Sequence, residues 1–200
     1  MKEIDKMLAG KLYIAKDETL STLHQKAIAK LKEFNNESDT SKRDIIIRSL
    51  FKTVGKNCYI EPPLKMDYGI NTSVGDNFYA NFDLIILDVA EVTIGNNCFI
   101  GPRVSLFCAG HPISKDVRNR GLEYGRKITI GDDVWIGGNT VINPGVTIGS
   151  NVVIGSGSVV TKDIPSNVVA CGNPCHVLRP ITKEDYEYWH KLEEEYDQNC

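Results

Sequence analysis

The chain has 200 residues, 42% of them hydrophobic, and a formal net charge of −3 at pH 7. This length suits one well-buried core rather than two, and the weak negative charge argues against a nucleic-acid-binding protein. The opening MKEIDKMLAG lacks an apolar run of signal-peptide length, and no stretch of about 18 apolar residues could span a bilayer, so we expect a cytoplasmic protein with no membrane partner.

Residues 1–53 are predicted to form a helical cap. Asp17 can cap a helix that ends at Asn35 and Asn36, and a second helix is expected from near Ser41 to Phe51. The apolar residues of the first helix recur at helical spacing: Leu20, Leu23, Ala27, Leu31 and Phe34. The repeats that follow predict a solenoid, and its open end must not expose unpaired strands. We therefore expect the two helices to cover the first coil.

From position 54 the chain repeats with a period of six residues. The repeat is loose at first (VGKNCY, VGDNFY), firmer from Ile94 and most regular from Ile130: IGDDVW, IGGNTV, INPGVT, IGSNVV, IGSGSV. Neither an amphipathic helix nor a hairpin strand has this period, which is typical of a β-solenoid. The antiparallel strands of a sandwich are the alternative, but these would vary in length, with turn signals about every 8 to 12 residues.

Each hexapeptide can form one short strand and one bend, so three of them make a triangular coil. The aliphatic residue that opens each repeat is expected to point inward and to stack on the neighbouring coils. A second inward position holds small or β-branched residues: Cys98, Val104, Val134, Val146, Val152 and Ser158. Two extra residues are expected between Leu87 and Val92, where a bulge could push a side chain out of the coil.

The hexapeptide pattern stops in a loop at 111–127 and resumes at Ile128. A long excursion from a tight solenoid is the kind of loop that carries function. It begins with His111, whose side chain suits proton transfer near neutral pH, so His111 is a candidate general base. A histidine that merely begins a surface loop is the alternative. The solenoid domain is placed at 54–180.

The end of the chain, 181–200, is predicted to form a short helix. Thr182 and Asp185 resemble a capping box, and Tyr186, Trp189 and Leu192 form an apolar stripe. We expect this stripe to pack on the solenoid.

The six cysteines lack a zinc-site spacing, so we expect free thiols. They are Cys58, Cys98, Cys108, Cys171, Cys175 and Cys200. The four histidines (His24, His111, His176 and His190) are spread over four regions, which argues against a three-histidine zinc site. We therefore predict no metal.

Two strings carry a family resemblance: NFYANFDLIILDVAEVTIGNNCFIGPRVSLFCAGHPI and ITIGDDVWIGGNTVINPGVTIGSNVVIGSGSVVTKDIPSNVVACGNPCHVLR. With the opening MLAGKLYIAKDETL, they resemble the galactoside and maltose O-acetyltransferase family. The resemblance implies a mainly β fold, a left-handed parallel β-helix with an N-terminal helical cap. It also implies acetyl-CoA as co-substrate, a sugar-like acceptor, and a homotrimer whose active sites lie between neighbouring solenoids.

The same resemblance assigns site residues. His111 and Asn81 match catalytic positions. The predicted acceptor-binding residues are Asp17, Tyr79, Asn81 and Asp88. The predicted CoA-binding residues are Trp135, Gly138, Ser156, Thr161, Lys162, His176 and Arg179. Three positions depart from the family pattern: Asp88 is followed by Val89, Asp67 precedes Tyr68, and His176 stands where arginine is common. These departures leave the identity of the acceptor open.

The expected mechanism is direct transfer, in which His111 removes the proton of the acceptor hydroxyl and the Gly138 N–H helps to hold the thioester oxygen. Glu123 could orient the imidazole or be solvated. A covalent route through Cys108 lacks support from spacing or resemblance. A non-sugar hydroxyl compound as acceptor, or a non-catalytic binding solenoid, are the alternative functions.

Overall fold

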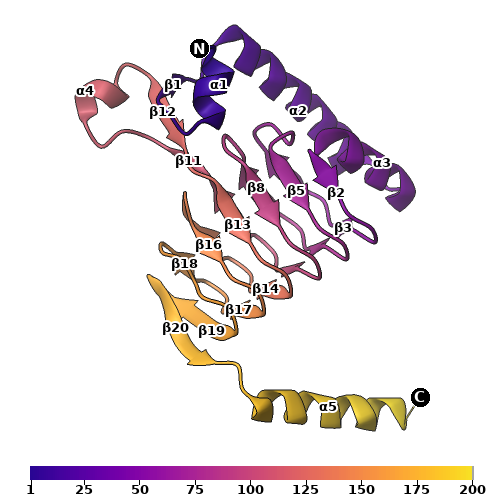
Figure 1. Cartoon of the computed structure of the whole chain (residues 1–200). Coiled ribbons are helices and arrows are strands. Elements are labelled where there is room, and N and C mark those ends of the chain that lie inside the picture. The colour runs from indigo at the N-terminus through magenta and orange to yellow at the C-terminus, as the bar shows by residue number, and fades with distance from the viewer. Residues whose placement is uncertain (200) are drawn as a thin grey trace.

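The computed structural model describes residues 1–199 and contains the predicted parallel β-helix (Figure 1). Its three faces are parallel sheets. The first face holds β2 (Thr53–Val54), β5 (Thr72–Val74), β8 (Val92–Ile94), β13 (Ile128–Ile130) and β16 (Thr147–Ile148). The second holds β3 (Tyr59–Ile60), β6 (Tyr79–Ala80), β9 (Phe99–Ile100), β14 (Val134–Ile136), β17 (Val152–Ile154) and β19 (Val168–Gly172), with β20 (Cys175–Pro180) antiparallel at its edge. The third holds β4 (Leu64–Met66), β7 (Leu84–Leu87), β10 (Ser105–Phe107), β15 (Val141–Ile142) and β18 (Val159–Val160).

Three columns of corners join the faces, and we name each by a residue it contains. The asparagine corner joins the first face to the second and comprises 55–58, 75–78, 95–98, 131–133, 149–151 and 165–167. The glycine corner joins the second face to the third and comprises 61–63, 81–83, 101–104, 137–140 and 155–158. The histidine corner leads from the third face to the next coil and comprises 67–71, 88–91, 108–127, 143–146 and 161–163.

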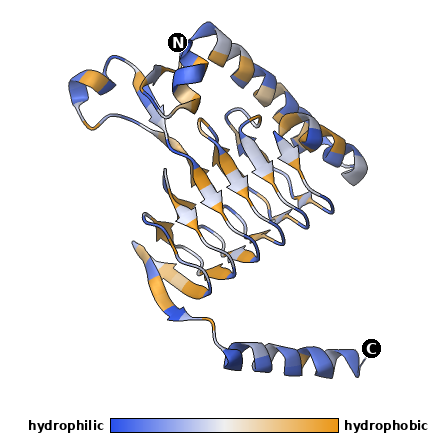
Figure 2. Ribbon diagram, in the orientation of Figure 1, coloured by the Kyte–Doolittle hydropathy of each residue, from blue (hydrophilic) through white to orange (hydrophobic). Residues whose placement is uncertain are grey.

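The apolar columns of the sequence form the core, as predicted. The repeat-opening residues Ile94, Ile100, Leu106, Ile130, Ile136, Ile142, Ile148, Ile154 and Val160 are all buried, and so is the second inward column from Cys98 to Ser158. Figure 2 shows hydrophobic segments recurring from strand to strand along the solenoid. Burial of apolar surface, at roughly 25 cal/mol per Å², is the main stabilising contribution to such a core.

Side-chain ladders hold the asparagine corner. Asn57, Asn77 and Asn97 adopt left-handed backbone angles (φ 54°, 57° and 54°), which asparagine tolerates better than most residues. The Asn57 amide donates to Asn77 Oδ1 at 3.1 Å, and the Asn77 amide donates to Asn97 Oδ1 at 2.8 Å. Each coil is thus tied to the next through the solvent-facing turn.

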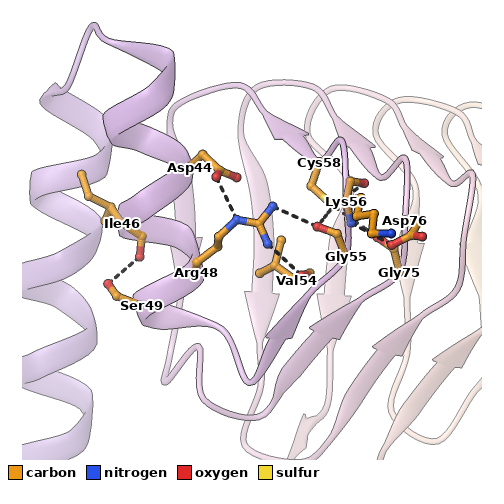
Figure 3. Close-up of polar contacts among 10 residues, drawn as sticks. All are labelled: Asp44, Ile46, Arg48, Ser49, Val54, Gly55, Lys56, Cys58, Gly75 and Asp76. Atoms are coloured by element: carbon orange, nitrogen blue, oxygen red, sulfur yellow. Dashed lines mark hydrogen bonds and ion pairs between the residues drawn. The ribbon is translucent and has the colours of Figure 1, made fainter.

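The predicted helical cap covers the start of the solenoid (Figure 1). It consists of α2 (Glu18–Asn36) and α3 (Thr40–Leu50), and Asp17 caps α2 as expected. In Figure 3, Arg48 of α3 reaches the edge of the first coil. Its guanidinium donates to the carbonyl oxygens of Val54 and Gly55, both at 2.9 Å, and to Asp44 at 2.8 Å. The cap therefore satisfies edge carbonyls that have no preceding coil to pair with.

The first 16 residues do not lie over the first coil. They form α1 (Glu3–Leu8) and β1 (Tyr13–Ile14), and β1 pairs antiparallel with β12 (Leu122–Gly125) in the excursion loop. Sequence patterns did not predict either element, because β1 is short and its partner lies more than a hundred positions away in the chain. This pairing makes the N-terminal segment part of the loop's support.

The C-terminal helix α5 (Lys183–Asp197) forms behind the predicted capping box, but the prediction that it packs on the solenoid is wrong for the single chain. Within the described residues none of its side chains is buried, and Trp189 is 66% exposed. Figure 1 shows the helix projecting away from the coils. Arg179 of β20 ties its first turn to the solenoid by donating to Asp185 Oδ1 at 2.8 Å. Among the described residues, no helix combines the length and apolarity that crossing a membrane requires.

Candidate active site

The excursion loop is a folded hairpin. It runs from β11 (Ala109–Gly110) through α4 (Lys115–Arg118) to β12, and β12 is held between β11 and β1. Ala109 pairs with Gly125 and Gly110 with Tyr124. Extending this register by one residue places His111 level with Glu123. The exposed His111 thus stands at the point where the rigid corner becomes the hairpin.

Gly110 lets the Tyr124 ring lie against the backbone next to His111. A Cβ at Gly110 would sit 2.6 Å from Tyr124 Cζ and 2.8 Å from its hydroxyl oxygen, closer than atoms can approach without displacing the ring. The guanidinium of Arg126 lies 5.6 Å from the centre of the same ring, within range of a cation–π interaction. These contacts fix the strand from which His111 projects.

Glu123 has a defined partner, but that partner is not His111. The Tyr13 hydroxyl donates to Glu123 Oε2 at 3.1 Å, and Tyr13 is completely buried. Burial, and then the Glu123 charge, raise the pKa of Tyr13 above its ordinary range, so the phenol stays protonated and keeps donating. Within residues 1–199, His111 itself has no side-chain hydrogen bond. Glu123 is thus neither hydrogen-bonded to the His111 imidazole nor fully solvated, because Tyr13 holds its carboxylate.

A cavity of about 330 Å³ lies beside the hairpin. It is lined by Tyr13, Ala15, Leu20, Ser21, His24, Gln25, Asp67, Tyr68, Val89 and Glu123. The lining thus joins the N-terminal segment, α2, the histidine corner and the excursion loop. Tyr13 and His24 were not predicted as site residues. No sequence signal marks them, because a tyrosine before a predicted helix and a histidine within it are compatible with simple packing.

Asp17, predicted to contact the acceptor, is not in this lining. Its carboxylate accepts hydrogen bonds from the backbone N–H groups of Thr19 at 3.0 Å and Leu20 at 3.2 Å. It therefore serves as the N-cap of α2, a role worth about 1 kcal/mol, and Ala15 lines the cavity instead.

Asp88, also predicted to contact the acceptor, has no exposed surface in the single chain. Its Oδ1 accepts from the Tyr68 N–H at 2.8 Å, and its Oδ2 accepts from the Thr72 hydroxyl at 3.2 Å. The wide turn expected between Leu87 and Val92 is present, but it directs this side chain inward rather than out of the coil. Asp88 therefore holds the backbone of Tyr68. Tyr68 lines the cavity, and Asp88 does not.

Asp88 makes stability depend on pH. Burial raises its pKa to about 6, from an ordinary 3.8, against the lowering effect of its hydrogen bonds. Because the folded state binds the proton more tightly, the stabilisation is complete below about pH 4 and lost as pH rises through about 6. A shift of roughly two units corresponds to about 3 kcal/mol. We expect the unfolding free energy of the wild type, relative to Asp88→Asn, to fall by up to about 3 kcal/mol between about pH 4 and about pH 7.

This prediction is checked by urea titrations of both proteins at a series of pH values. Taking the difference from Asp88→Asn removes the pH dependence that comes from the ionisable groups present in both proteins. A difference that stays constant with pH would show that the hydrogen bonds to Asp88 fully offset its burial.

The remaining predicted residues divide between separate parts of the solenoid. Asn81, Gly138 and Ser156 all belong to the glycine corner, and Tyr79 and Trp135 project from the second face, where Trp135 is 56% exposed. His111 belongs to the histidine corner. A single chain therefore does not bring the two groups together.

The four other predicted CoA contacts lie near the end of the solenoid. Thr161 and Lys162 are exposed in the histidine corner, and His176 and Arg179 lie on β20. Arg179 is engaged with Asp185, so a phosphate would have to share or displace that ion pair.

Cys108 does not suit covalent catalysis. It is completely buried, and burial raises the pKa of its thiol to about 12. A thiolate nucleophile requires the opposite shift. Within residues 1–199 no group of three His, Cys, Asp or Glu side chains is placed to hold a metal ion. Cys200 lies outside the described residues.

Three family descriptions match parts of the chain. Residues 6–55 match the maltose acetyltransferase hexapeptide capping motif, residues 91–113 the hexapeptide repeat of succinyl-transferase, and residues 127–162 the bacterial transferase hexapeptide (six repeats). The chain is 48% identical over 193 residues to the galactoside O-acetyltransferase of Escherichia coli (strain K12), across 96% of this chain and 95% of that protein.

Two solved structures show the same similarity in three dimensions. A maltose O-acetyltransferase from Clostridium difficile 630 superposes with a TM-score of 0.90 at 50% identity, over 92% of this chain and 99% of that chain. A galactoside acetyltransferase in complex with coenzyme A superposes with a TM-score of 0.90 at 48% identity, over 93% and 94% of the two chains.

Proposed function

Since the chain belongs to the galactoside and maltose O-acetyltransferase family of hexapeptide-repeat enzymes, we propose that it transfers the acetyl group of acetyl-CoA to a sugar hydroxyl, with His111 as general base. The observation that carries this proposal is the place of His111. His111 is exposed at the base of a braced hairpin, one residue beyond the Gly110–Tyr124 pair, and Glu123 on the facing strand lines a cavity large enough for a monosaccharide.

The chemistry needs three things: a base for the hydroxyl proton, a donor for the oxyanion that forms on the thioester carbonyl, and proximity. His111 is exposed, so its imidazole is accessible to an acceptor. Transfer is direct: the acceptor oxygen attacks the thioester carbon, its proton goes to His111, and the CoA thiolate leaves and is protonated. The burial of Cys108 supports this route over an acetyl-cysteine intermediate.

Asn81 and the Gly138 N–H are proposed to complete the site from the glycine corner. Asn81 Oδ1 accepts from the Phe82 N–H at 2.8 Å, which orients the side chain. Within the described part of the chain its NH₂ group has no hydrogen-bond partner, so it can donate to an acceptor or to the oxyanion. Trp135 on the second face and Ser156 in the glycine corner are proposed to bind CoA together with Gly138.

The separation of the two corners supports active sites formed between copies of the chain. His111 on one copy would face the glycine corner and second face of a neighbour, and three copies close this arrangement into a ring. We therefore propose a homotrimer. Light scattering coupled to size-exclusion chromatography should give three times the mass of the chain, and a fully active monomer would overturn the shared site.

The reaction is tested by following thiol release from acetyl-CoA with maltose, glucose, galactosides and chloramphenicol, each compared with acetyl-CoA alone. Mass spectrometry of the product distinguishes transfer from hydrolysis. Acetylation of a sugar supports the proposal. Acetylation of chloramphenicol alone would assign the enzyme to a different acceptor, and thiol release without any acetylated product would reject the transferase.

Lys162 is proposed to bind a phosphate of CoA. Charge-assisted hydrogen bonds contribute roughly 1.5–3 kcal/mol, so Lys162→Ala should raise the KM for acetyl-CoA about tenfold or more, with little change in kcat. The exposed Lys32 on α2 offers a matched control, Lys32→Ala. The KM for dephospho-acetyl-CoA, which lacks the 3′-phosphate, is measured as well. If Lys162→Ala raises that KM by the same factor as the KM for acetyl-CoA, the contact is not with the 3′-phosphate.

A further inference from the structure

The cavity beside the hairpin contains a group of ionisable side chains that the mechanism above does not use. They are Tyr13, His24, Asp67, Tyr68 and Glu123. Burial raises the pKa of Asp67, while His24 lowers it and Glu123 raises it further. They come from β1, α2, the histidine corner and β12, so the cavity is a composite feature of the fold.

The carboxylates in the cavity are not neutralised by the protein. The lining includes no lysine or arginine, and within residues 1–199 neither Asp67 nor Glu123 forms an ion pair with one. His24 is the one basic side chain in the lining. Its Nδ1 lies 2.8 Å from the Asp67 carbonyl oxygen, which can only accept, so this nitrogen carries the hydrogen. That bond directs His24 to the backbone of Asp67 rather than to the carboxylate.

Tyr68 gives independent evidence of a ligand. It is 6% exposed, and among the described residues its hydroxyl has no hydrogen-bond partner. Burial, then the charges of Asp67 and Glu123, raise the pKa of Tyr68 to about 12, so the hydroxyl stays protonated and can donate. Its backbone N–H is held by Asp88 at 2.8 Å. The residue is nearly buried while its unpaired hydroxyl stays accessible at a residue that lines the cavity, which is an arrangement expected where a ligand oxygen binds.

We propose that this cavity is the acceptor subsite and that it selects a sugar carrying a protonated amine. The ammonium group lies between Asp67 and Glu123, and the Tyr68 hydroxyl donates to a neighbouring sugar oxygen. An unmodified hydroxyl near His111 receives the acetyl group, so the amine is recognised and not acetylated. This inference rests on the proposed function. It requires that neutral sugars bind less well and that acidic sugars bind least.

The test compares four methyl glycosides of one stereochemistry: the 2-amino sugar, its N-acetyl derivative, the neutral parent sugar and the uronic acid. We expect kcat/KM for the amino sugar to exceed that for the neutral sugar at least tenfold, with the uronate lowest. Asp67→Asn and Glu123→Gln should each reduce this ratio to near one. Glu18→Gln, which removes an exposed charge at the start of α2, should leave the ratio intact. Hydroxylamine, which cleaves acetyl esters faster than amides, should release the acetyl group.

Equal kcat/KM for the amino and neutral sugars would overturn the inference while leaving sugar acetylation in place. Because the variants could fail to fold, the wild type supplies a second measurement. The preference should disappear as pH rises through the pKa of the sugar amine, and a preference that persists above it would also overturn the inference. Calorimetric binding of the four glycosides without acetyl-CoA separates the two proposals. Tighter binding of the amino sugar without transfer supports the subsite and rejects the enzymatic function.

Discussion

Replacing His111 with alanine is expected to lower kcat by about 10²–10⁴-fold, the range typical for the loss of a positioned general base. The KM for acetyl-CoA should change little, because the residues proposed to bind CoA lie at other positions along the solenoid. The exposed imidazole makes no side-chain contact within the described residues that the fold depends on, so the variant should remain folded. Thiol release measured at saturating acetyl-CoA and acceptor gives the comparison.

His190→Ala is a suitable control, since His190 is a histidine on the projecting helix α5, paired with Glu193. It should retain wild-type activity. Full activity in the His111 variant would remove the base assignment and leave positioning as the source of the rate.

Gly95→Val is expected to destabilise the protein by about 3 kcal/mol or more, which is at the upper end for overpacking. A Cβ at this position would lie 2.6 Å from the Gly131 carbonyl oxygen and 2.7 Å from its carbonyl carbon, and it would also strike Asp132. The obstruction is the backbone of the next coil, which cannot rotate away as a side chain can. Urea or thermal unfolding measures the loss.

Gly157→Asn separates crowding from backbone conformation. Gly157 has φ +73°, and nothing lies within 4 Å of a Cβ added there. Asparagine accepts that conformation, as it does at the other solenoid corners, so this change should alter the unfolding free energy by less than about 1 kcal/mol. Comparable losses in the two variants would mean that any side chain at a corner is harmful, whatever its contacts.

The repetitive part of the fold could be predicted because its signal is local. Ile136 is buried for the same reason as Ile130 and Ile142, because each of them opens a repeat of six residues. The start of the excursion loop and the helix after Asp17 could be predicted in the same way. In each case a few neighbouring residues determine the structure.

The features that were missed depend on contacts between distant segments. Tyr13 becomes part of the cavity only because β1 pairs with β12. Asp88 resembles a pocket residue in the sequence, and only the folded corner shows its carboxylate turned inward on Tyr68. The position of α5 was wrong because an apolar stripe indicates that a helix has a partner without indicating which surface supplies it. Asn81 and His111 lie in different corners, a separation that spacing along the chain does not reveal.

The hairpin that carries His111 also has a consequence for chain entropy. Thr129 pairs with Thr147, 18 positions later, whereas Thr93 pairs with Thr129, 36 positions later, because the excursion lies between them. Loop-closure entropy grows only logarithmically with length, so this doubling costs about 0.6 kcal/mol. A solenoid can therefore lengthen a loop at one corner at little cost to its own folding, and the strands on either side of the loop keep their pairing.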